Sequence, residues 1–228
     1  MSPPSPTPWI IAHRANGFGQ RENTLAAFSA VPRELGVELD VWMTRDHVPV
    51  VHHDAHVRLA DGTRHRITAV ARTHLPDYVP TLAAALEALS GVQWINIEIK
   101  TTRATLTRLL DQLIRLDVCI SSFSAHLLRQ VRTAIPNADL ALLAPPHAGP
   151  VAALRPAREL GCTGLHIART QLSPAWIRLI HEHGLALRVY TVNDVQGWAL
   201  CRHLGVAGVF TDRPLAALDW LRGQSPGQ

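Results

Sequence analysis

The sequence predicts an α/β protein: a single TIM-type (β/α)8 barrel with a short insertion after the second strand. Two observations support this fold. Short apolar runs alternate with longer segments whose apolar residues recur at helical spacing, from one end of the chain to the other. There are eight such units, and strands that alternate with helices pair in parallel through right-handed crossovers, so eight of them favour a closed barrel. An open doubly wound sheet is the alternative, but the Gly-rich dinucleotide loop that would support it is absent from the sequence.

The expected strands are the short apolar runs, and each is followed by a helical pattern. They cover residues 9–14, 37–43, 94–100, 118–123, 139–144, 164–168, 186–192 and 208–212. The segment after the third strand shows the helical spacing clearly, with leucines at positions 106, 109, 110, 113 and 116.

Local signals mark the start of several helices. Asn23 or Thr24 can cap the first helix, because a short polar side chain can accept a hydrogen bond from the free backbone N–H groups there. Pro174 after Ser173, and Pro214 two residues after Asp212, are typical of helix starts, where the missing proline N–H costs nothing.

One segment breaks the regular alternation. Residues 44–79 contain a second apolar run at 48–52 and then a polar stretch with Asp61-Gly62, a pair typical of turns. We interpret this segment as a βα insertion that lies over the mouth of the barrel.

The length of 228 residues suits one domain, expected at residues 9–222. Residues 1–8 contain four prolines and are expected to be a disordered lead-in, and residues 223–228 a flexible tail. The start lacks the basic and apolar regions of a secretory signal, and no apolar run approaches the roughly 20 residues of a membrane span. Three widely spaced cysteines, at 119, 162 and 201, favour reduced, buried thiols. Together these features predict a cytoplasmic protein without a stable membrane anchor.

The charge balance points to a small anionic partner. The formal net charge is +4, but the arginines are spread along the chain, without a basic run or interleaved aromatic residues, so a nucleic-acid partner is not expected. The 22 basic residues comprise 21 arginines and one lysine, Lys100. The sequence leaves the oligomeric state open.

Acidic residues occur in pairs on two expected strands. Residues i and i+2 of a strand project from the same face, so Glu38 and Asp40 project together, as do Glu98 and Lys100. If these faces point inward, three carboxylates and one ammonium group meet at the barrel mouth. Clustered carboxylates repel one another unless a cation or a proton intervenes, and an all-oxygen set of ligands suits Mg²⁺ or Ca²⁺.

The simpler interpretation of a Glu-x-Asp pair is a solvent-facing strand. Large apolar residues flank both pairs here, which favours burial of the outer face, and charges on the inner face then need partners. Lys100 supports this interpretation, because a compact ammonium can fit beside a carboxylate and a phosphate where a guanidinium fork cannot. Chance survival of one lysine is the alternative.

Two of the 13 histidines stand out. His13 follows the apolar run at residues 10–12, and His53 follows Pro49-Val-Val51 and precedes Asp54. Imidazole titrates near neutral pH, so two histidines near a cation suit general acid–base catalysis. Most other histidines are expected on the surface, among them His65, His74, His147, His181 and His183.

These residues lie in a recognisable series of motifs. In order, they are Ala12-His-Arg14, Glu22-Asn-Thr-Leu-Ala-Ala-Phe28, Glu38-Leu-Asp-Val41, Thr44-Arg-Asp46, Pro49-Val-Val-His-His-Asp54, Pro80-Thr-Leu82, Asn96-Ile-Glu-Ile-Lys100, Ser121-Ser-Phe123, Tyr190-Thr-Val-Asn193 and Thr211-Asp-Arg-Pro214. Each motif alone is weak, but in this order the chain resembles the glycerophosphodiester phosphodiesterase family, and in particular its short cytoplasmic bacterial members. The resemblance runs from about Ile10 to Pro214.

The resemblance implies an α/β barrel that uses a divalent cation to hydrolyse small glycerophosphodiesters to sn-glycerol 3-phosphate and an alcohol. It also implies roles for seven residues. They are His13 and His53 as acid and base, Glu38, Asp40 and Glu98 as metal ligands, and Arg14 and Lys100 as phosphate-binding groups. The chain departs from the family pattern at Ala15, usually Gly, and at Arg21, usually Pro, which affects the geometry of the first loop.

Two alternatives remain open at this stage. One is a lysophospholipase D-type lipid phosphodiesterase of the same fold, which the six tryptophans suggest. Most of these, such as Trp94, Trp176 and Trp198, lie within strand or helix patterns, where core packing explains them. The other is a non-catalytic barrel that binds a phosphate ligand, for which two histidines and three carboxylates are not needed.

Overall fold

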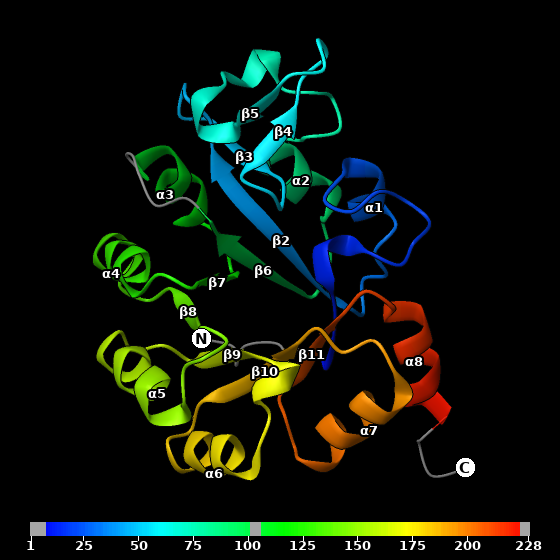
Figure 1. Ribbon diagram of the computed structural model, residues 1–228, viewed down its shortest axis with the longest axis vertical. Coiled ribbons are helices and arrows are strands. Elements are labelled where there is room, and N and C mark those ends of the chain that lie inside the picture. The colour runs from blue at the N-terminus through cyan, green and yellow to red at the C-terminus, as the bar shows by residue number, and fades with distance from the viewer. Residues whose placement is uncertain (1–7, 101–105, 224–228) are drawn as a thin grey trace.

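The computed structural model describes residues 8–100 and 106–223. It contains a closed ring of eight parallel strands, as the sequence predicts (Figure 1). The ring closes because β1 pairs with both β11 and β2. The strands of the ring are β1 (Ile10–Ala12), β2 (Gly36–Met43), β6 (Trp94–Ile99), β7 (Cys119–Ser122), β8 (Asp139–Leu143), β9 (Gly164–Ala168), β10 (Ala186–Tyr190) and β11 (Gly208–Thr211).

The α-helices lie on the outside of the ring (Figure 1). They are α1 (Leu25–Ser29), α2 (Leu82–Ala88), α3 (Thr107–Leu113), α4 (Ala125–Ala134), α5 (Pro150–Glu159), α6 (Pro174–Glu182), α7 (Val195–His203) and α8 (Pro214–Gly223). Short 3-10 turns follow β1 and β9 and occur twice in the insertion: η1 (His13–Ala15), η2 (Ile67–Ala69), η3 (Arg72–His74) and η4 (Arg169–Gln171).

The main core lies between the strands and the helices. Along β6, Ile97 and Ile99 belong to this core and are almost fully buried. Asn96 and Glu98 alternate with them and line a cavity inside the ring. Because side chains alternate along each strand, an apolar outer layer packs against the helices while polar side chains face the interior.

The predicted helix starts are largely confirmed. Thr24 is the cap of α1, because its side chain accepts a hydrogen bond from the Ala27 N–H at 3.3 Å. Asn23, the other candidate, is buried and points to Asp40 instead. Pro174 and Pro214 are the first residues of α6 and α8.

The insertion after β2 differs from the expected βα unit. Its elements are β3 (Pro49–Val51), which pairs antiparallel with β2, the hairpin of β4 (His56–Arg58) and β5 (Arg64–Arg66), and two 3-10 turns. The hairpin forms because Gly62 adopts a φ of +83° in the turn, where a side chain would be strained. A second apolar cluster, built around Val50, Val57 and Ile67, holds the insertion together.

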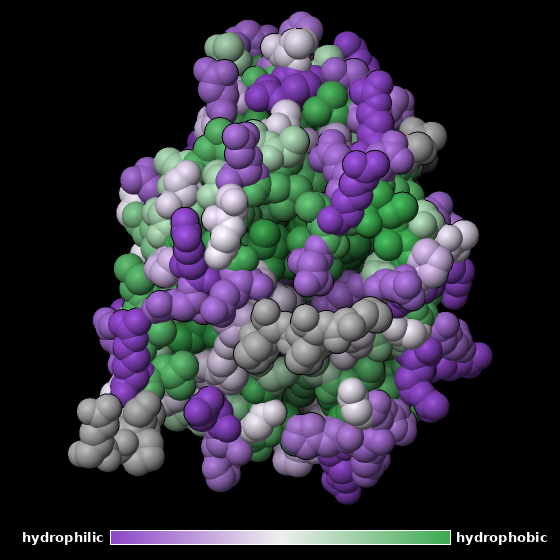
Figure 2. All heavy atoms as spheres, turned by 180° about the vertical axis from the view of Figure 1, so that it is seen from behind, coloured by the Kyte–Doolittle hydropathy of each residue, from purple (hydrophilic) through white to green (hydrophobic). Residues whose placement is uncertain are grey.

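The position of the insertion also differs from the prediction. It extends beyond the C-terminal end of β2 (Figure 1) and forms the knob at the top of Figure 2, where most outer side chains are hydrophilic. It does not cover the barrel mouth: within the described part of the chain, His53 is its one residue that lines the central cavity.

The expected lead-in and tail, residues 1–8 and 223–228, lie almost entirely outside the described residues. Gly223 is described and ends α8, so the last helix runs one residue beyond the expected domain boundary. None of the helices in residues 8–100 and 106–223 has the length and apolar character needed to cross a bilayer.

Candidate active site

A cavity of about 160 Å³ opens inside the ring, next to the C-terminal ends of the strands. Six of the seven site residues predicted from the sequence line it: His13, Arg14, Glu38, His53, Glu98 and Lys100. Asp40, the seventh, is 1% exposed and contacts both Arg14 and Lys100. The fold therefore brings all seven residues together from four separate segments of the chain.

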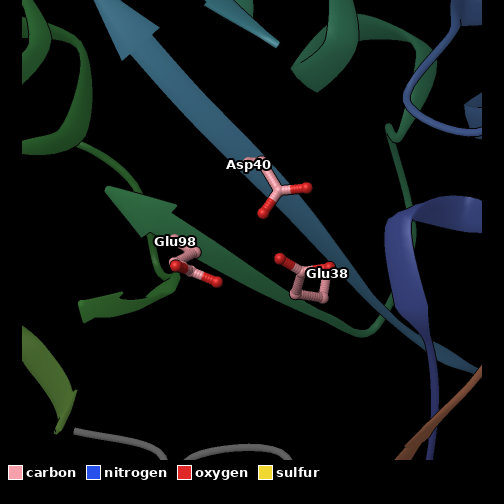
Figure 3. A group of neighbouring side chains, drawn as sticks. All are labelled: Glu38, Asp40 and Glu98. Atoms are coloured by element: carbon pink, nitrogen blue, oxygen red, sulfur yellow. The ribbon is translucent and has the colours of Figure 1, made fainter. Parts of the chain in front are cut away.

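The three carboxylates meet as the spacing predicts. Glu38 and Asp40 project from β2 and Glu98 from the neighbouring strand β6, and all three point toward one another (Figure 3). One oxygen of each lies within 4.8 Å of the others, and all three residues are buried. They converge because Asp40 and Glu98 are direct partners in the parallel ladder.

Two basic side chains are inserted among the carboxylates. Lys100 Nζ lies 2.9 Å from Glu98 Oε1 and 3.1 Å from Asp40 Oδ1. Arg14 Nε lies 3.5 Å from Asp40 Oδ2, and the Arg14 backbone N–H donates to Glu38 Oε2 at 3.0 Å. The predicted contact between Lys100 and Glu98 is thus present, and the single lysine is part of a buried ion cluster.

The charges in this cluster shift one another's pKa values. Burial raises the pKa of Glu38 well above its ordinary value, and the nearby Asp40 and Glu98 charges raise it further. Burial also opposes ionisation of Asp40, but Lys100 and Arg14 outweigh it and lower that pKa. Burial lowers the pKa of Lys100, but the Asp40 and Glu98 carboxylates outweigh it and raise the value above its ordinary range.

The three carboxylates fit a hard divalent cation. Their ligand atoms are all oxygens, which Mg²⁺ and Ca²⁺ prefer. Carboxylates this close repel one another when ionised, and a cation between them would relieve both this repulsion and the cost of burying their charge. Among the described residues, Glu38, Asp40 and Glu98 form the group of acidic, His or Cys side chains that lie close enough together to hold a metal ion.

His13 is held by a carboxylate that is distant in the sequence but follows the neighbouring strand β11. Its Nδ1 lies 2.8 Å from Asp212 Oδ1, and the Asn193 amide donates to Asp212 Oδ2 at 2.7 Å. Burial raises the pKa of Asp212, but hydrogen bonds from His13 and Asn193 outweigh it and lower the value to about 2. An ionised carboxylate can only accept, so Nδ1 of His13 donates this hydrogen bond.

His53 has a similar but more exposed arrangement. Its Nδ1 lies 3.0 Å from Asp54 Oδ1, and 69% of the Asp54 side chain is exposed. Burial lowers the pKa of His53, with nearby Arg14 and Lys100 acting in the same direction, so this imidazole is neutral at neutral pH. Each histidine of the site is therefore oriented by one aspartate.

The structure adds three supporting residues that the sequence did not assign. Asp212 and Asn193 orient His13, and the Asn23 amide donates to Asp40 Oδ2 at 2.9 Å. All three lie within the series of motifs, in Glu22-Asn-Thr, Tyr190-Thr-Val-Asn193 and Thr211-Asp212. A polar residue directly after an apolar strand was the available signal for Asn193 and Asp212.

The two departures from the family pattern have clear structural settings. Ala15 is fully buried and has a φ of +54°, a left-handed conformation that costs a residue with a Cβ energy and that glycine adopts freely. Arg21 places its guanidinium 3.6 Å from the centre of the Tyr78 ring, which links the first loop to the insertion.

Other expectations from the sequence are confirmed. The three cysteines are free and buried. Trp176 and Trp198 are 3% and 2% exposed, so they serve core packing. The five histidines expected on the surface are exposed: His65, His74, His147, His181 and His183.

Comparison with known proteins gives the family. Residues 13–216 match the model of the glycerophosphoryl diester phosphodiesterase family. The chain is 27% identical to a glycerophosphodiester phosphodiesterase of Caldanaerobacter subterraneus subsp. tengcongensis, over 93% of this chain and 97% of that protein.

Solved structures agree with the sequence comparisons. The glycerophosphodiester phosphodiesterase of Thermotoga maritima superposes with a TM-score of 0.78 at 26% identity, over 92% of this chain and 97% of that chain. An Oleispira antarctica phosphodiesterase, solved with its product sn-glycerol-3-phosphate, shares the fold with a TM-score of 0.77 at 23% identity, over 95% and 97% of the two chains. The chain therefore belongs to the glycerophosphoryl diester phosphodiesterase family.

Proposed function

We propose that this phosphodiesterase hydrolyses small glycerophosphodiesters to sn-glycerol 3-phosphate and an alcohol, with His13 and His53 as acid and base and a divalent cation as cofactor. One observation carries the proposal: three carboxylates, two basic side chains and two histidines that are each held by an aspartate converge on one cavity. The Oleispira antarctica phosphodiesterase, in complex with its product sn-glycerol-3-phosphate, supports this product.

In this proposal, Arg14 and Lys100 bind the phosphodiester. Both line the cavity and are held in place by carboxylates, so their positive charges are oriented before the substrate binds. Fixed donors of this kind stabilise the charge that develops on the phosphoryl oxygens in the transition state. The ammonium of Lys100 acts as a compact point charge, while Arg14 offers several donors.

The two histidines move the protons. The neutral Nε2 of one imidazole accepts the proton of the attacking oxygen, and the other imidazole, in its protonated form, donates a proton to the leaving alkoxide. The attacking oxygen is either water or the neighbouring hydroxyl of the glycerol group; in the second case a cyclic phosphate forms, and water then opens it to glycerol 3-phosphate. Asp212 and Asp54 hold the Nδ1 atoms, so the rings keep the orientation and tautomer that leave Nε2 for proton exchange.

Glu38, Asp40 and Glu98 would hold Mg²⁺ or Ca²⁺. When bound, the cation would polarise a phosphate oxygen and lower the pKa of a coordinated hydroxyl. Lys100 neutralises part of the negative charge of Asp40 and Glu98, so the site remains compatible with folding at neutral pH before the cation binds.

A cytoplasmic location is part of the same proposal. Free, reduced thiols are typical of proteins in reducing compartments, and Cys119, Cys162 and Cys201 are all unpaired. Fractionation of the producing cells with a marker for each compartment tests it.

The decisive assay measures release of glycerol 3-phosphate from glycerophosphocholine. We expect turnover, its loss after treatment with EDTA, and its recovery on addition of Mg²⁺ or Ca²⁺. Release of choline phosphate instead of glycerol 3-phosphate would contradict the proposed bond cleavage. Lysophosphatidylcholine, measured in parallel, tests the lipid-directed alternative, which requires the lipid to be the better substrate.

The metal site is tested by Glu38→Gln, which keeps the volume but removes a charged ligand. We expect a large loss of activity and a higher cation concentration for half-maximal rate. Glu182→Gln, on exposed α6, is the matched control and should behave as the wild type. Unchanged activity and cation dependence in Glu38→Gln would remove Glu38 from the proposed ligand set.

A further inference from the structure

The floor of the cavity carries a histidine that the proposed reaction does not use. His166 lies in the middle of β9, is fully buried and lines the cavity together with Asn96 and Phe210. Its neighbours Leu165 and Ile167 belong to the outer core beneath the helices, so the imidazole faces the barrel interior.

Polar atoms on this floor lack partners within the described chain. Neither ring nitrogen of His166 has a hydrogen bond, and the same holds for Oδ1 of Asn96. The Asn96 amide group is fixed, because its Nδ2 donates to Ser121 Oγ at 2.9 Å. A buried polar group without a partner destabilises the fold, so proteins rarely retain one without a use for it.

The chemistry of the floor selects the kind of group it can bind. Burial, with the nearby Arg188 charge, lowers the pKa of His166 well below its ordinary value, so the ring is neutral. A neutral imidazole has one donor and one acceptor nitrogen, and Asn96 Oδ1 is an acceptor. An anionic oxygen could accept from the imidazole N–H but has no proton to donate to Asn96 Oδ1. A hydroxyl group, which both donates and accepts, matches the floor.

The order of residues along β6 indicates which hydroxyl is meant. Asn96, Glu98 and Lys100 occupy alternate positions, so they follow one another on the inner face from the floor toward the mouth. In the proposed function, Lys100 binds the phosphate and Glu98 belongs to the cation site. The part of the substrate that extends past them, toward Asn96 and His166, is the distal end of the glycerol group.

We propose that His166 and Asn96 bind the terminal hydroxyl of the substrate's glycerol group and so select glycerol over shorter or deoxygenated alcohols. This inference rests on the proposed function, in which the phosphate lies at the mouth. His166 is a specificity-determining residue in this scheme and takes no part in proton transfer.

The test compares two substrates in two enzymes. One substrate is glycerophosphocholine, and the other is the phosphocholine ester of propane-1,2-diol, which keeps the hydroxyl next to the ester but lacks the terminal one. We expect the wild type to prefer the glycerol ester in kcat/KM by on the order of 10–100-fold, the effect of one buried hydrogen-bonding group. In His166→Phe this preference should fall close to 1, mainly through a lower kcat/KM for the glycerol ester.

Stability separates substrate recognition from a structural role. Phenylalanine keeps a ring against Phe210, which lies 4.9 Å away, and removes two unpaired polar atoms, so the Tm of His166→Phe should equal or exceed that of the wild type. His166→Leu should lose the preference in the same way. His181→Phe, the same change on an exposed helix, should keep wild-type kinetics.

The outcomes are distinct. A preserved preference in a folded His166→Phe, no preference in the wild type, or a large loss of Tm in both His166 variants would each overturn the inference while the phosphodiesterase activity stands. If the wild type hydrolyses neither ester, the proposed function fails and the inference fails with it.

Discussion

His13 and His53 differ from the other histidines because aspartates orient them in the cavity. We predict that His13→Ala and His53→Ala each lower kcat by on the order of 10²–10⁴-fold, the usual effect of losing a general acid or base. His181→Ala should have little effect, because His181 is exposed on α6. Steady-state kinetics on glycerophosphocholine measures all three, and equal behaviour of the three variants would refute the acid–base assignment.

Asp212 acts through His13, so its removal should change the reaction without removing a reacting group. Asp212→Asn keeps the shape of the side chain but loses the carboxylate that accepts the hydrogen bond from Nδ1–H and so fixes this tautomer. We predict a loss of kcat of on the order of 10²-fold or more, as expected for a misoriented catalytic histidine. The KM for glycerophosphocholine and the Tm should stay close to those of the wild type.

The split between kcat and Tm distinguishes this role from a structural one. If Asp212 served only to hold the loop after β11, the variant would lose Tm and activity together. Asp194→Asn is the comparison, because Asp194 caps the nearby helix α7 and lies outside the cavity. Asparagine caps a helix about as well as aspartate does, so this variant should keep both Tm and kcat close to those of the wild type.

Lys100 is the residue at which a conservative change should be least tolerated. Its ammonium lies between Asp40 and Glu98 at 3.1 and 2.9 Å, and a planar guanidinium is too large to replace it there without displacing a carboxylate. We predict that Lys100→Arg lowers kcat/KM by on the order of 10-fold or more and leaves the protein folded. Arg155→Lys, on a side chain that is 84% exposed, should be silent.

This prediction is tested by kinetics and thermal unfolding together. Wild-type kcat/KM in Lys100→Arg would place Lys100 outside the working site. Lys100 could be singled out from the sequence because it is the one lysine in a chain with 21 arginines. It could not show that Asp40, on another strand, shares the ammonium with Glu98.

At the scale of elements, the insertion determines whether His53 reaches the cavity. The second apolar cluster holds the insertion, and Ile67, which is fully buried, is one of its members. We predict that Ile67→Ala costs about 2–5 kcal/mol within this cluster, because it leaves a cavity among close-packed side chains. Relative to the wild type, hydrogen exchange in this variant should accelerate across residues 44–79 more than in the barrel strands. The kcat should also fall.

The exposed neighbour Thr68 supplies the control for this element. Thr68→Ala should leave both exchange and kcat close to those of the wild type. If Ile67→Ala weakened the barrel strands and the insertion equally, the insertion would not be a separately stabilised unit. The expected βα form of this segment was wrong because turn chemistry at Gly62 favours a hairpin, and a short apolar run does not distinguish a strand from a helix.

At the scale of the whole molecule, His166 should make stability depend on pH. Its pKa in the folded protein lies well below its ordinary value, because burial and Arg188 disfavour the charged form. The unfolded chain therefore binds the proton first, and this contribution to stability is complete above about pH 6.5 and is lost as pH falls below it. The loss is at most about 1.4 kcal/mol per pH unit for one proton.

Comparison of the wild type with His166→Phe separates the contribution of His166 to the pH dependence of stability from that of the other titrating groups. We predict that the free energy of unfolding in urea falls less steeply between pH 6.5 and 5 for His166→Phe than for the wild type. Glu38, whose raised pKa acts in the opposite direction, contributes equally to both proteins and cancels in the difference. Parallel curves for the two proteins would refute the prediction.

Membership of the glycerophosphoryl diester phosphodiesterase family is also a property of the whole chain. It sets aside the non-catalytic phosphate-binding barrel considered from the sequence, because the match runs from residue 13 to residue 216 and thus covers nearly the whole barrel.

The features that depend on local order along the chain could be predicted from the amino-acid sequence alone. The eight strands, the starts of α6 and α8, and the shared face of Glu38 with Asp40 follow from side-chain periods and turn chemistry, which act over a few residues. The motifs around His13, His53 and Lys100 are equally local. Short stretches of the chain are therefore enough to predict all of these features.

The contacts between residues that are distant in the sequence became visible only in the folded barrel. His13 and Asp212 are 199 positions apart and become neighbours because β1 pairs with β11 when the barrel closes. Asn96 and His166 share a floor for the same reason, although neither stands out in a motif as a binding group. Closure of the ring is a property of all eight strands together, so no short segment of the sequence carries the information about what lies across it.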